Sequence, residues 1–268
     1  MIIVVNPSGN HSNRLFQAIH LEAFAIENKC RYYNPTFSEM GRYFNIKKNL
    51  FDFVFDFIFR KLRTRLRLKI HDFSEEYFNQ HAPSFLILKK NIAFVSGWFF
   101  FQKSLTLKYK AYFRQKYSLS PEIIEKIMVD EKCNFREIRE MMQSYEVVLG
   151  VHIRRGDYKE WENGKYYYND NVYKAAISQT RNLFKSTKVL ILLFSNDHIS
   201  FNNNDNTILS NNEWYIDHYL MGLCDYLIGP PSTFSLWATY IGPKVKYYHI
   251  NNQFDFPKSI EEFQEYNG

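Results

Sequence analysis

Two adjacent arginines, with a histidine and an aspartate beside them, are the residues of this sequence best suited to chemistry. They follow an apolar, β-branched run that starts at Val147 and predicts a buried strand, and the cluster comprises His152, Arg154, Arg155 and Asp157. Two guanidinium groups at the carboxyl end of a core strand are costly without an anionic partner, and ligands of α/β sheets bind at that edge. The cluster therefore predicts a site for an anion, most simply a phosphate.

Alternation along the strand puts His152 and Arg154 on one face and Arg155 and Asp157 on the other. One arginine can then face a ligand while the other pairs with a carboxylate, and Gly156 allows the chain to turn. The alternative is that Arg155 and Asp157 form a buried ion pair that only fastens a loop, because such pairs also occur away from active sites. The motif by itself leaves both interpretations open.

A second predicted core strand, Lys188–Phe194, also ends in polar residues, and Asp197 is the carboxylate among them. A carboxylate at this place can accept two hydrogen bonds from the N1–H and amino group of guanine. It can equally cap the turn that follows the strand.

A third predicted strand, Tyr226–Gly229, leads through two prolines into a helix that opens with Ser232, Thr233, Phe234 and Ser235. Hydroxyl groups, backbone N–H groups and the positive end of the helix dipole suit a diphosphate. Ordinary capping of the helix is the alternative.

The N-terminal region begins with a predicted strand at 2–5, a loop that contains Gly9, and a predicted helix at 13–28. Asn13 and Gln17 lie one helical turn apart near the start of that helix. They are either a polar rim over a ligand cleft or, more simply, a helix cap and a surface glutamine.

Strands and helices alternate along the chain, which predicts an α/β protein. A predicted helix at 121–143 ends just before the strand that begins at Val147, so we expect two domains, residues 1–143 and 144–268. Another strand is predicted at 92–98, and further helices at 107–117, 171–184 and 213–224.

The net charge of +6 and the isoelectric point near 9.0 suit an acidic partner, which could be a nucleic acid, an anionic membrane or a phosphorylated substrate. Three widely spaced cysteines indicate neither a disulfide framework nor a zinc site, and the apolar run after Met1 is too short for a signal peptide. We therefore expect a cytoplasmic protein. Residues 51–70 are aromatic and then basic, which predicts either peripheral contact with the inner face of a membrane or a core helix with a solvated basic end.

Several segments, in order along the chain, resemble motifs of the α-1,2-fucosyltransferase family. Residues 152–157 resemble its His-x-Arg-Arg-Gly-Asp motif, and residues 217–224 and 232–237 resemble its Asp-x-x-Leu-Met-x-x-Cys and Ser-Thr-Phe-Ser-Trp-Trp segments. Residues 9–17 and 194–197 are similar to the glycine-rich opening and to the Phe-Ser-Asp-Asp segment of the family. The sequence departs from these motifs at Ser12, Arg14, Asn196 and Leu236.

The resemblance implies a GT-B-like architecture of two Rossmann-type domains facing a donor/acceptor cleft, an N-terminal one on the acceptor side and a C-terminal one that binds the GDP-sugar. It implies transfer of fucose from GDP-fucose, with inversion, to a galactose 2-OH of an oligosaccharide or lipid-linked glycan, in the synthesis of surface polysaccharide. No metal or other cofactor is expected, since the sequence contains no Asp-x-Asp motif and no His/Cys cluster.

With this resemblance, Arg154 is expected at the β-phosphate, helped by His152 and by the helix start at 232–235. Arg155 is expected to be mainly structural through Asp157 while still lining the donor site, Asp197 to bind guanine, and Asn13 to lie near the donor sugar or the acceptor.

The general base stays open among Asp157, Glu160 and Glu162. A transferase that uses another nucleotide sugar is the main alternative. A nucleic-acid-binding protein fits the charge, but it gives no reason for apolar strands that end in Arg-Arg, Asn-Asp and Ser-Thr, so we expect no nucleic acid as a partner.

Overall fold

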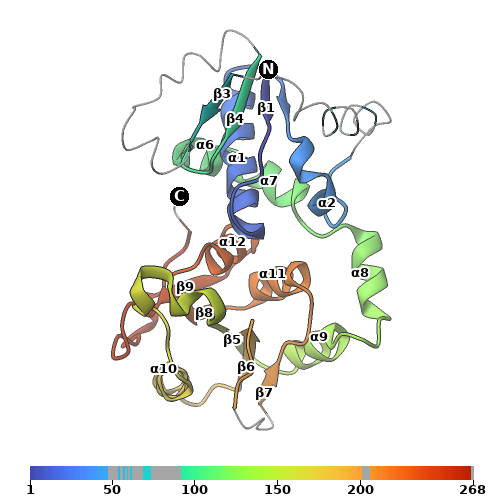
Figure 1. Cartoon of the computed structure of the whole chain (residues 1–268). Coiled ribbons are helices and arrows are strands. Elements are labelled where there is room, and N and C mark those ends of the chain that lie inside the picture. The colour runs from blue at the N-terminus through green and yellow to red at the C-terminus, as the bar shows by residue number, and fades with distance from the viewer. Residues whose placement is uncertain are drawn as a thin grey trace. The chain divides into compact units, whose positions relative to one another are not determined.

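The computed structural model describes residues 1–47, 54, 57, 59, 61, 69–73, 92–200 and 206–266. The chain divides into a first unit, Met1–Ser118, and a second unit, Leu119–Tyr266. Each unit is an α/β fold with its own parallel sheet, as Figure 1 shows.

The first unit contains a parallel sheet with the strand order β2-β1-β4-β3. Its strands are β1 (Ile2–Val4), β2 (Tyr32–Tyr33), β3 (Ile70–Asp72) and β4 (Ala93–Ser96). Its helices are α1 (His11–Glu27), α2 (Ser38–Gly41), α6 (Lys103–Lys108) and α7 (Lys110–Lys116), with a 3₁₀ turn at Pro35–Phe37. The single helix predicted at 107–117 is therefore two short helices.

A buried carboxylate joins α1 to the segment around α7. Glu22 accepts hydrogen bonds from the hydroxyl groups of Tyr112 at 2.9 Å and Tyr117 at 3.1 Å, and from the Lys116 ammonium group at 2.5 Å. Because a buried charge needs partners for its lone pairs, these three donors let the carboxylate remain in the interior.

The second unit contains a parallel sheet with the strand order β7-β6-β5-β8-β9. Its strands are β5 (Val147–Ile153), β6 (Val189–Ser195), β7 (Thr207–Leu209), β8 (Tyr226–Gly229) and β9 (Lys246–His249). Its α-helices are α8 (Pro121–Met128), α9 (Phe135–Gln143), α10 (Asp170–Asn182), α11 (Trp214–Leu223) and α12 (Thr233–Ile241). Its 3₁₀ turns are η2 (Gly156–Lys159), η3 (Trp161–Gly164) and η4 (Ile260–Glu262).

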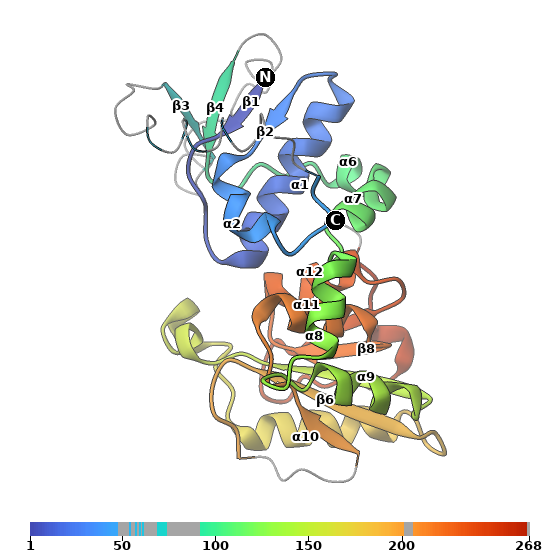
Figure 2. The same cartoon turned by 90° about the vertical axis from the view of Figure 1, so that its right-hand side faces the viewer.

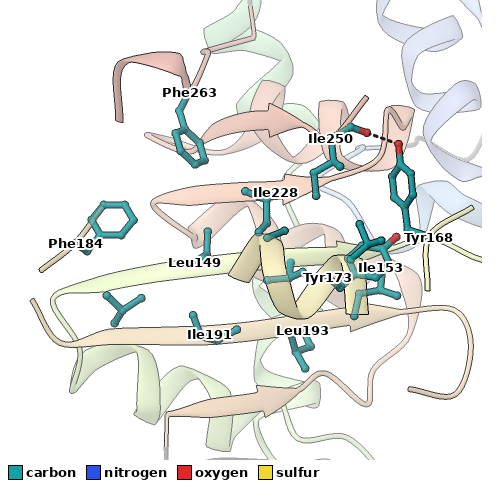
Figure 3. Packing of buried hydrophobic residues seen from close by; sticks show 14 residues of the cluster. Leu149, Ile153, Tyr168, Tyr173, Phe184, Ile191, Leu193, Ile228, Ile250 and Phe263 are labelled. Carbon is teal, nitrogen blue, oxygen red and sulfur yellow. Dashed lines mark hydrogen bonds between the residues drawn. The ribbon is translucent and has the colours of Figure 1, made fainter. Parts of the chain in front are cut away.

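Alternate residues of β5 build the core on one face of this sheet. Leu149, Val151 and Ile153 pack in one buried cluster with Tyr173 of α10 and Ile191 of β6 (Figure 3). The intervening residues of β5, including His152, consequently face the opposite side of the sheet.

The boundary expected between residues 143 and 144 is wrong, because the two units divide between Ser118 and Leu119. The helix predicted at 121–143 is in fact α8 and α9, and both belong to the second unit (Figure 2). Asn134, at the start of α9, donates a hydrogen bond to the backbone oxygen of Leu209 at 2.8 Å. The Phe135 ring also contacts Tyr219 of α11, at 6.0 Å between ring centroids.

Within the described ranges, no helix is long and apolar enough to cross a membrane. Most of the segment 51–70, for which membrane contact was one interpretation, lies outside the residues that the structure describes.

Candidate active site

The strand order of the second unit reverses beside β5. The chain runs outward from β5 to β6 and β7 on one side and returns to β8 and β9 on the other. In open parallel sheets, ligands bind outside the carboxyl ends of the strands at such a switch point. Here those ends deliver Arg154 after β5 and Ser232 after β8.

Gly229 lets the strands on the two sides of this point approach closely. A Cβ atom at Gly229 would lie 2.5 Å from the backbone oxygen of His152 and 3.0 Å from its Cβ atom. On its other side Gly229 pairs with His249 of β9. Residues in register on parallel strands share a face of the sheet. The rings of His152 and His249 therefore lie on the same face, one on each side of Gly229.

Both histidines are neutral at pH 7. Burial, with the positive charge of Arg154 and the proximity of His249, lowers the pKa of His152 to about 3, and burial lowers the pKa of His249 to about 4. The buried Nδ1 of His152 and Nε2 of His249 have no hydrogen-bond partner among the described residues. His152 can thus exchange a hydrogen bond with a ligand, and its help to Arg154 stays a prediction.

Arg154 is held by the loop that follows it. Its Nη2 lies 2.8 Å from Oδ1 and 2.9 Å from Oδ2 of Asp157, and its guanidinium carbon lies 5.4 Å from the centre of the Tyr158 ring. The side chain is one-fifth exposed, and its buried Nε has no partner within the part of the chain that the structure covers. An unsatisfied N–H on a partly exposed guanidinium suits an anionic ligand.

Arg155 is built into the fold, but not through Asp157. It is buried and pairs with Asp170 at the start of α10, and its other nitrogens donate to the backbone oxygens of Tyr168 and His198 at 3.4 and 3.1 Å. The pairing with Asp157 that alternation suggested is therefore wrong. The strand ends at Ile153, and η2, which begins at Gly156 with φ +55°, turns Asp157 back toward Arg154.

The start of α12 is capped by its own side chains. The Ser232 hydroxyl accepts a hydrogen bond from the backbone N–H of Phe234 at 3.1 Å, and the Ser235 hydroxyl donates to the Ser232 backbone oxygen at 3.0 Å. Phe234 packs its ring between His152 and His218, at centroid distances of 5.3 and 3.8 Å. The capping interpretation is thus confirmed for Ser232. Phe234, which was predicted to bind the GDP-sugar, packs on the His152 ring. Thr233 is the first residue of the helix, where the positive end of the dipole lies.

Asp197 is exposed and accepts a hydrogen bond from the backbone N–H of His198 at 2.8 Å, so it caps the turn after β6. The neighbouring Asn196, where the sequence departs from the family motif, accepts from the backbone N–H of Arg155 at 3.0 Å. This side chain links the ends of β5 and β6.

Asn13 belongs to the first unit, whereas the other predicted site residues belong to the second. Helix α1 begins at His11, so Asn10 and not Asn13 occupies the cap position. Gln17 is 2% exposed and donates to the backbone oxygen of Gly97 at 2.6 Å. Neither interpretation of Gln17, as part of a rim or as a surface side chain, is therefore correct, because it joins α1 to the segment after β4.

Three residues of the second unit's site were missed from the sequence. Tyr158 donates from its hydroxyl group to the backbone oxygen of Pro231 at 2.6 Å, and so connects the loop after β5 to the loop after β8. Asp170 pairs with Arg155, and His249 shares the sheet face with His152. Tyr158 was within reach of sequence reasoning, since it directly follows the arginine motif. The other two depend on how distant segments pack.

Of the described residues, no three His, Cys, Asp or Glu side chains are grouped so that they could hold a metal ion.

A family model described as glycosyl transferase family 11 matches residues 5–263. A search of curated proteins finds no match.

Several solved structures share the fold. The fucosyltransferase NodZ from Bradyrhizobium superposes with a TM-score of 0.56 at 14% identity, covering 94% of this chain and 95% of that one. FUT1 from Arabidopsis thaliana in complex with GDP gives 0.58 at 12% identity, covering 94% and 71%. POFUT1 in complex with GDP-fucose gives 0.53 at 10% identity, covering 92% and 97%. The α/β fold with parallel sheets thus resembles that of fucosyltransferases, and with a family model that spans nearly its whole length the chain belongs to glycosyl transferase family 11.

Proposed function

We propose that this protein transfers fucose from GDP-fucose to a hydroxyl group of a saccharide acceptor. Membership of glycosyl transferase family 11 supports a sugar-transfer reaction. The choice of donor is supported by similar folds in NodZ soaked with GDP-fucose and in POFUT1 in complex with GDP-fucose.

The observation that carries the proposal is the position of Arg154 at the switch point of the second sheet. Asp157 holds one end of the guanidinium, and the buried Nε remains without a partner in the described ranges. Helix α12 begins shortly after the neighbouring strand, β8, ends, and the positive end of its dipole lies at this start. A guanidinium beside a helix start is a suitable arrangement for a diphosphate.

In the proposed reaction the bond between the anomeric carbon and the β-phosphate oxygen breaks, and its electron pair stays on the diphosphate. Arg154 and the α12 N-terminus stabilise this developing charge. The acceptor oxygen attacks the opposite face of the anomeric carbon, which inverts it, and the hydroxyl proton leaves to a base. Both oxygens of Asp157 already lie within 2.9 Å of Nη2 of Arg154, which favours Glu160 or Glu162 as that base.

The motif resemblance supports finer parts of the proposal. These are a GT-B-like pair of domains, an α-1,2 linkage to a galactose 2-OH, contact of Asp197 with guanine, reaction without a metal, and a role in the synthesis of surface polysaccharide on the cytoplasmic side of a membrane. Asn13 is proposed to lie near the donor sugar or the acceptor.

A transferase that uses another nucleotide sugar is the second candidate, because the same arginine and helix start would serve any diphosphate. A thermal-shift series with GDP, UDP, dTDP and ADP, each with and without Mg²⁺, separates the candidates. We expect GDP, and none of the other three nucleotides, to raise the melting temperature, by the same amount with and without Mg²⁺. The Arg154→Ala substitution should abolish this shift. A larger shift with another nucleotide, or one that requires Mg²⁺, would overturn the proposed donor.

A further inference from the structure

An exposed aromatic stack lies on the loop that follows Arg154. The Trp161 side chain is 42% exposed, and its ring stacks on Tyr166 with 5.3 Å between centroids and 29° between the ring planes. The Trp161 ring also contacts the buried Tyr158, with 4.7 Å between the centroids and 42° between the ring planes. A large apolar ring is thus presented to solvent by two aromatic neighbours that fix its position.

The backbone that carries this stack is in an unfavourable conformation. Glu162 and Asn163 have φ values of +51° and +56°, and Gly164 follows with +76°. Consecutive left-handed residues are rare for side chains with a Cβ atom, and strain of this kind persists where the surrounding structure requires it, often at ligand sites. The turn is tight, since a Cβ atom at Gly164 would lie 3.1 Å from the backbone oxygen of Lys159.

The stack is close to the proposed phosphate site and is fixed to it. The Arg154 guanidinium carbon lies 5.4 Å from the Tyr158 ring centre, and that centre lies 4.7 Å from the Trp161 ring, so Trp161 is at most about 10 Å from the guanidinium. A hydrogen bond from Tyr158, which supports the stack, to Pro231 joins this loop to the segment just before α12. All these contacts lie within the second unit, so the distance does not depend on the placement of the first unit.

We propose that the Trp161–Tyr166 stack binds the acceptor saccharide. This inference rests on the proposed function and adds the residues that hold its second substrate. When the diphosphate binds Arg154, the donor sugar lies next to the guanidinium and the acceptor lies one sugar ring further away. Trp161, at most about 10 Å from the guanidinium, is within reach of that acceptor. The apolar C–H face of a pyranose can pack on the exposed indole, while its hydroxyl groups reach the exposed Glu160, Glu162 and Lys165.

The other flat ligand of the reaction is guanine, and the surroundings of Trp161 favour the saccharide. Guanine has a proposed partner elsewhere, because the carboxylate of Asp197 after β6 can accept from its N1–H and amino group, whereas Trp161 lies on the loop after β5. An open platform of this kind suits a ligand that arrives from solvent and leaves after each turnover.

The test combines kinetics with direct binding. Lactose, which carries a galactose 2-OH, serves as the acceptor, and titration of GDP measures the nucleotide site separately. Trp161→Ala should raise the KM for lactose at least tenfold, change kcat less than threefold and leave the Kd for GDP within twofold of wild type. Trp161→Phe, which keeps an aromatic face, should fall in between.

Tyr145→Ala is the matched control. It removes a partly exposed aromatic ring that contacts the Lys188 ammonium group. Tyr145 precedes β5 and Lys188 precedes β6, so both lie at the amino ends of the strands, opposite the ends that lead to Arg154 and Asp197. This variant should behave as wild type in every assay. Circular dichroism and melting temperature establish that each variant is folded.

Saturation-transfer NMR on the GDP-bound protein with lactose makes the test independent of turnover. Saturation transfer to the galactose C–H protons in wild type, and its loss in Trp161→Ala, would support the platform. If the protein nevertheless transferred no fucose, only the proposed function would be overturned. An unchanged KM and NMR signal in Trp161→Ala, or absence of lactose binding to wild type, would overturn the inference. Weakened GDP binding in Trp161→Ala would assign the stack to guanine instead.

Discussion

Arg155 and Asp170 form an ion pair that ties the end of β5 to the first turn of α10. Asp170 also accepts hydrogen bonds from the backbone N–H and the hydroxyl group of Ser200, so the pair joins the segments after β5 and β6 to the same helix start. The two adjacent arginines of the motif are thereby distinguished: Arg155 is satisfied by the protein, and Arg154 presents a buried Nε that finds no partner among the described residues.

Asp170→Asn should destabilise the protein in a pH-dependent way. Burial raises the pKa of Asp170, but the hydrogen bonds from Arg155 and Ser200 outweigh it and bring the pKa down from 3.8 to about 2. Because the folded-state pKa is the lower one, the contribution is present above pH 3.8 and is lost as the pH falls toward 2. We expect the variant to lose on the order of 2 kcal/mol of unfolding free energy at pH 7, measured with urea, and the difference from wild type to shrink below about pH 4.

The control for this variant is Glu140→Gln, which breaks the exposed pair with Arg136 on α9. It should cost less than about 0.5 kcal/mol. A loss in Asp170→Asn that is equally small, or that does not change with pH, would contradict the structural role of the pair.

Arg154→Ala should impair turnover and leave the fold intact. We expect kcat/KM for transfer from GDP-fucose to fall by two or more orders of magnitude, corresponding to about 3 kcal/mol of transition-state stabilisation. Arg154→Lys keeps the charge but not the planar fork, and should recover only part of the loss. Arg136→Ala, which removes an exposed arginine of α9, is the control, and wild-type turnover in Arg154→Ala would refute the assignment.

Gly229→Ala should disrupt the switch point. The added Cβ atom would stand 2.5 Å from a backbone oxygen, that of His152, so β5 and β8 would have to separate there. We expect a loss on the order of 3 kcal/mol in unfolding free energy together with weaker GDP binding. At Gly41 an added Cβ atom would meet only side chains, at 3.7 Å or more, so Gly41→Ala should cost far less. Equal behaviour of the two variants in urea and in GDP titrations would argue against this close approach.

Glu22→Gln should destabilise the first unit more than Glu27→Gln does. Both carboxylates lie on α1 and accept hydrogen bonds from a lysine and at least one tyrosine, but Glu22 is buried and Glu27 is not. Removing one charge of a buried pair costs about 3 kcal/mol or more, whereas an exposed pair contributes less than about 1 kcal/mol. Urea unfolding of both variants measures the contrast, and similar losses would show that burial does not set the energy.

The sequence predicted the central strand ends well, because long apolar runs that stop at charged residues are a strong local signal. A strand that starts at Val147 and another at 188–194 were expected, and β5 and β6 lie there. The short strands at the sheet edges, such as β7 and β9, were not predicted, because three or four residues carry little periodicity. The break between α8 and α9 was missed because Asn134 is held there by a tertiary contact with Leu209.

The pairing of the site residues depended on information that lies outside the motif. Alternation predicted that Asp157 would pair with Arg155, but the 3₁₀ turn at Gly156 brought it to Arg154. The true partner of Arg155, Asp170, is set by how α10 docks on the sheet. The shared face of His152 and His249 likewise follows from the pairing of β8 with β9.

The strand β5, which ends just before Arg154, is bordered by β6 on one side and β8 on the other, so both edges of its backbone are hydrogen-bonded. Its amide protons should be among the slowest in the second unit to exchange with deuterium, since they are released only by large-scale opening of the sheet. The base from which Arg154 extends is therefore held until the second unit unfolds as a whole.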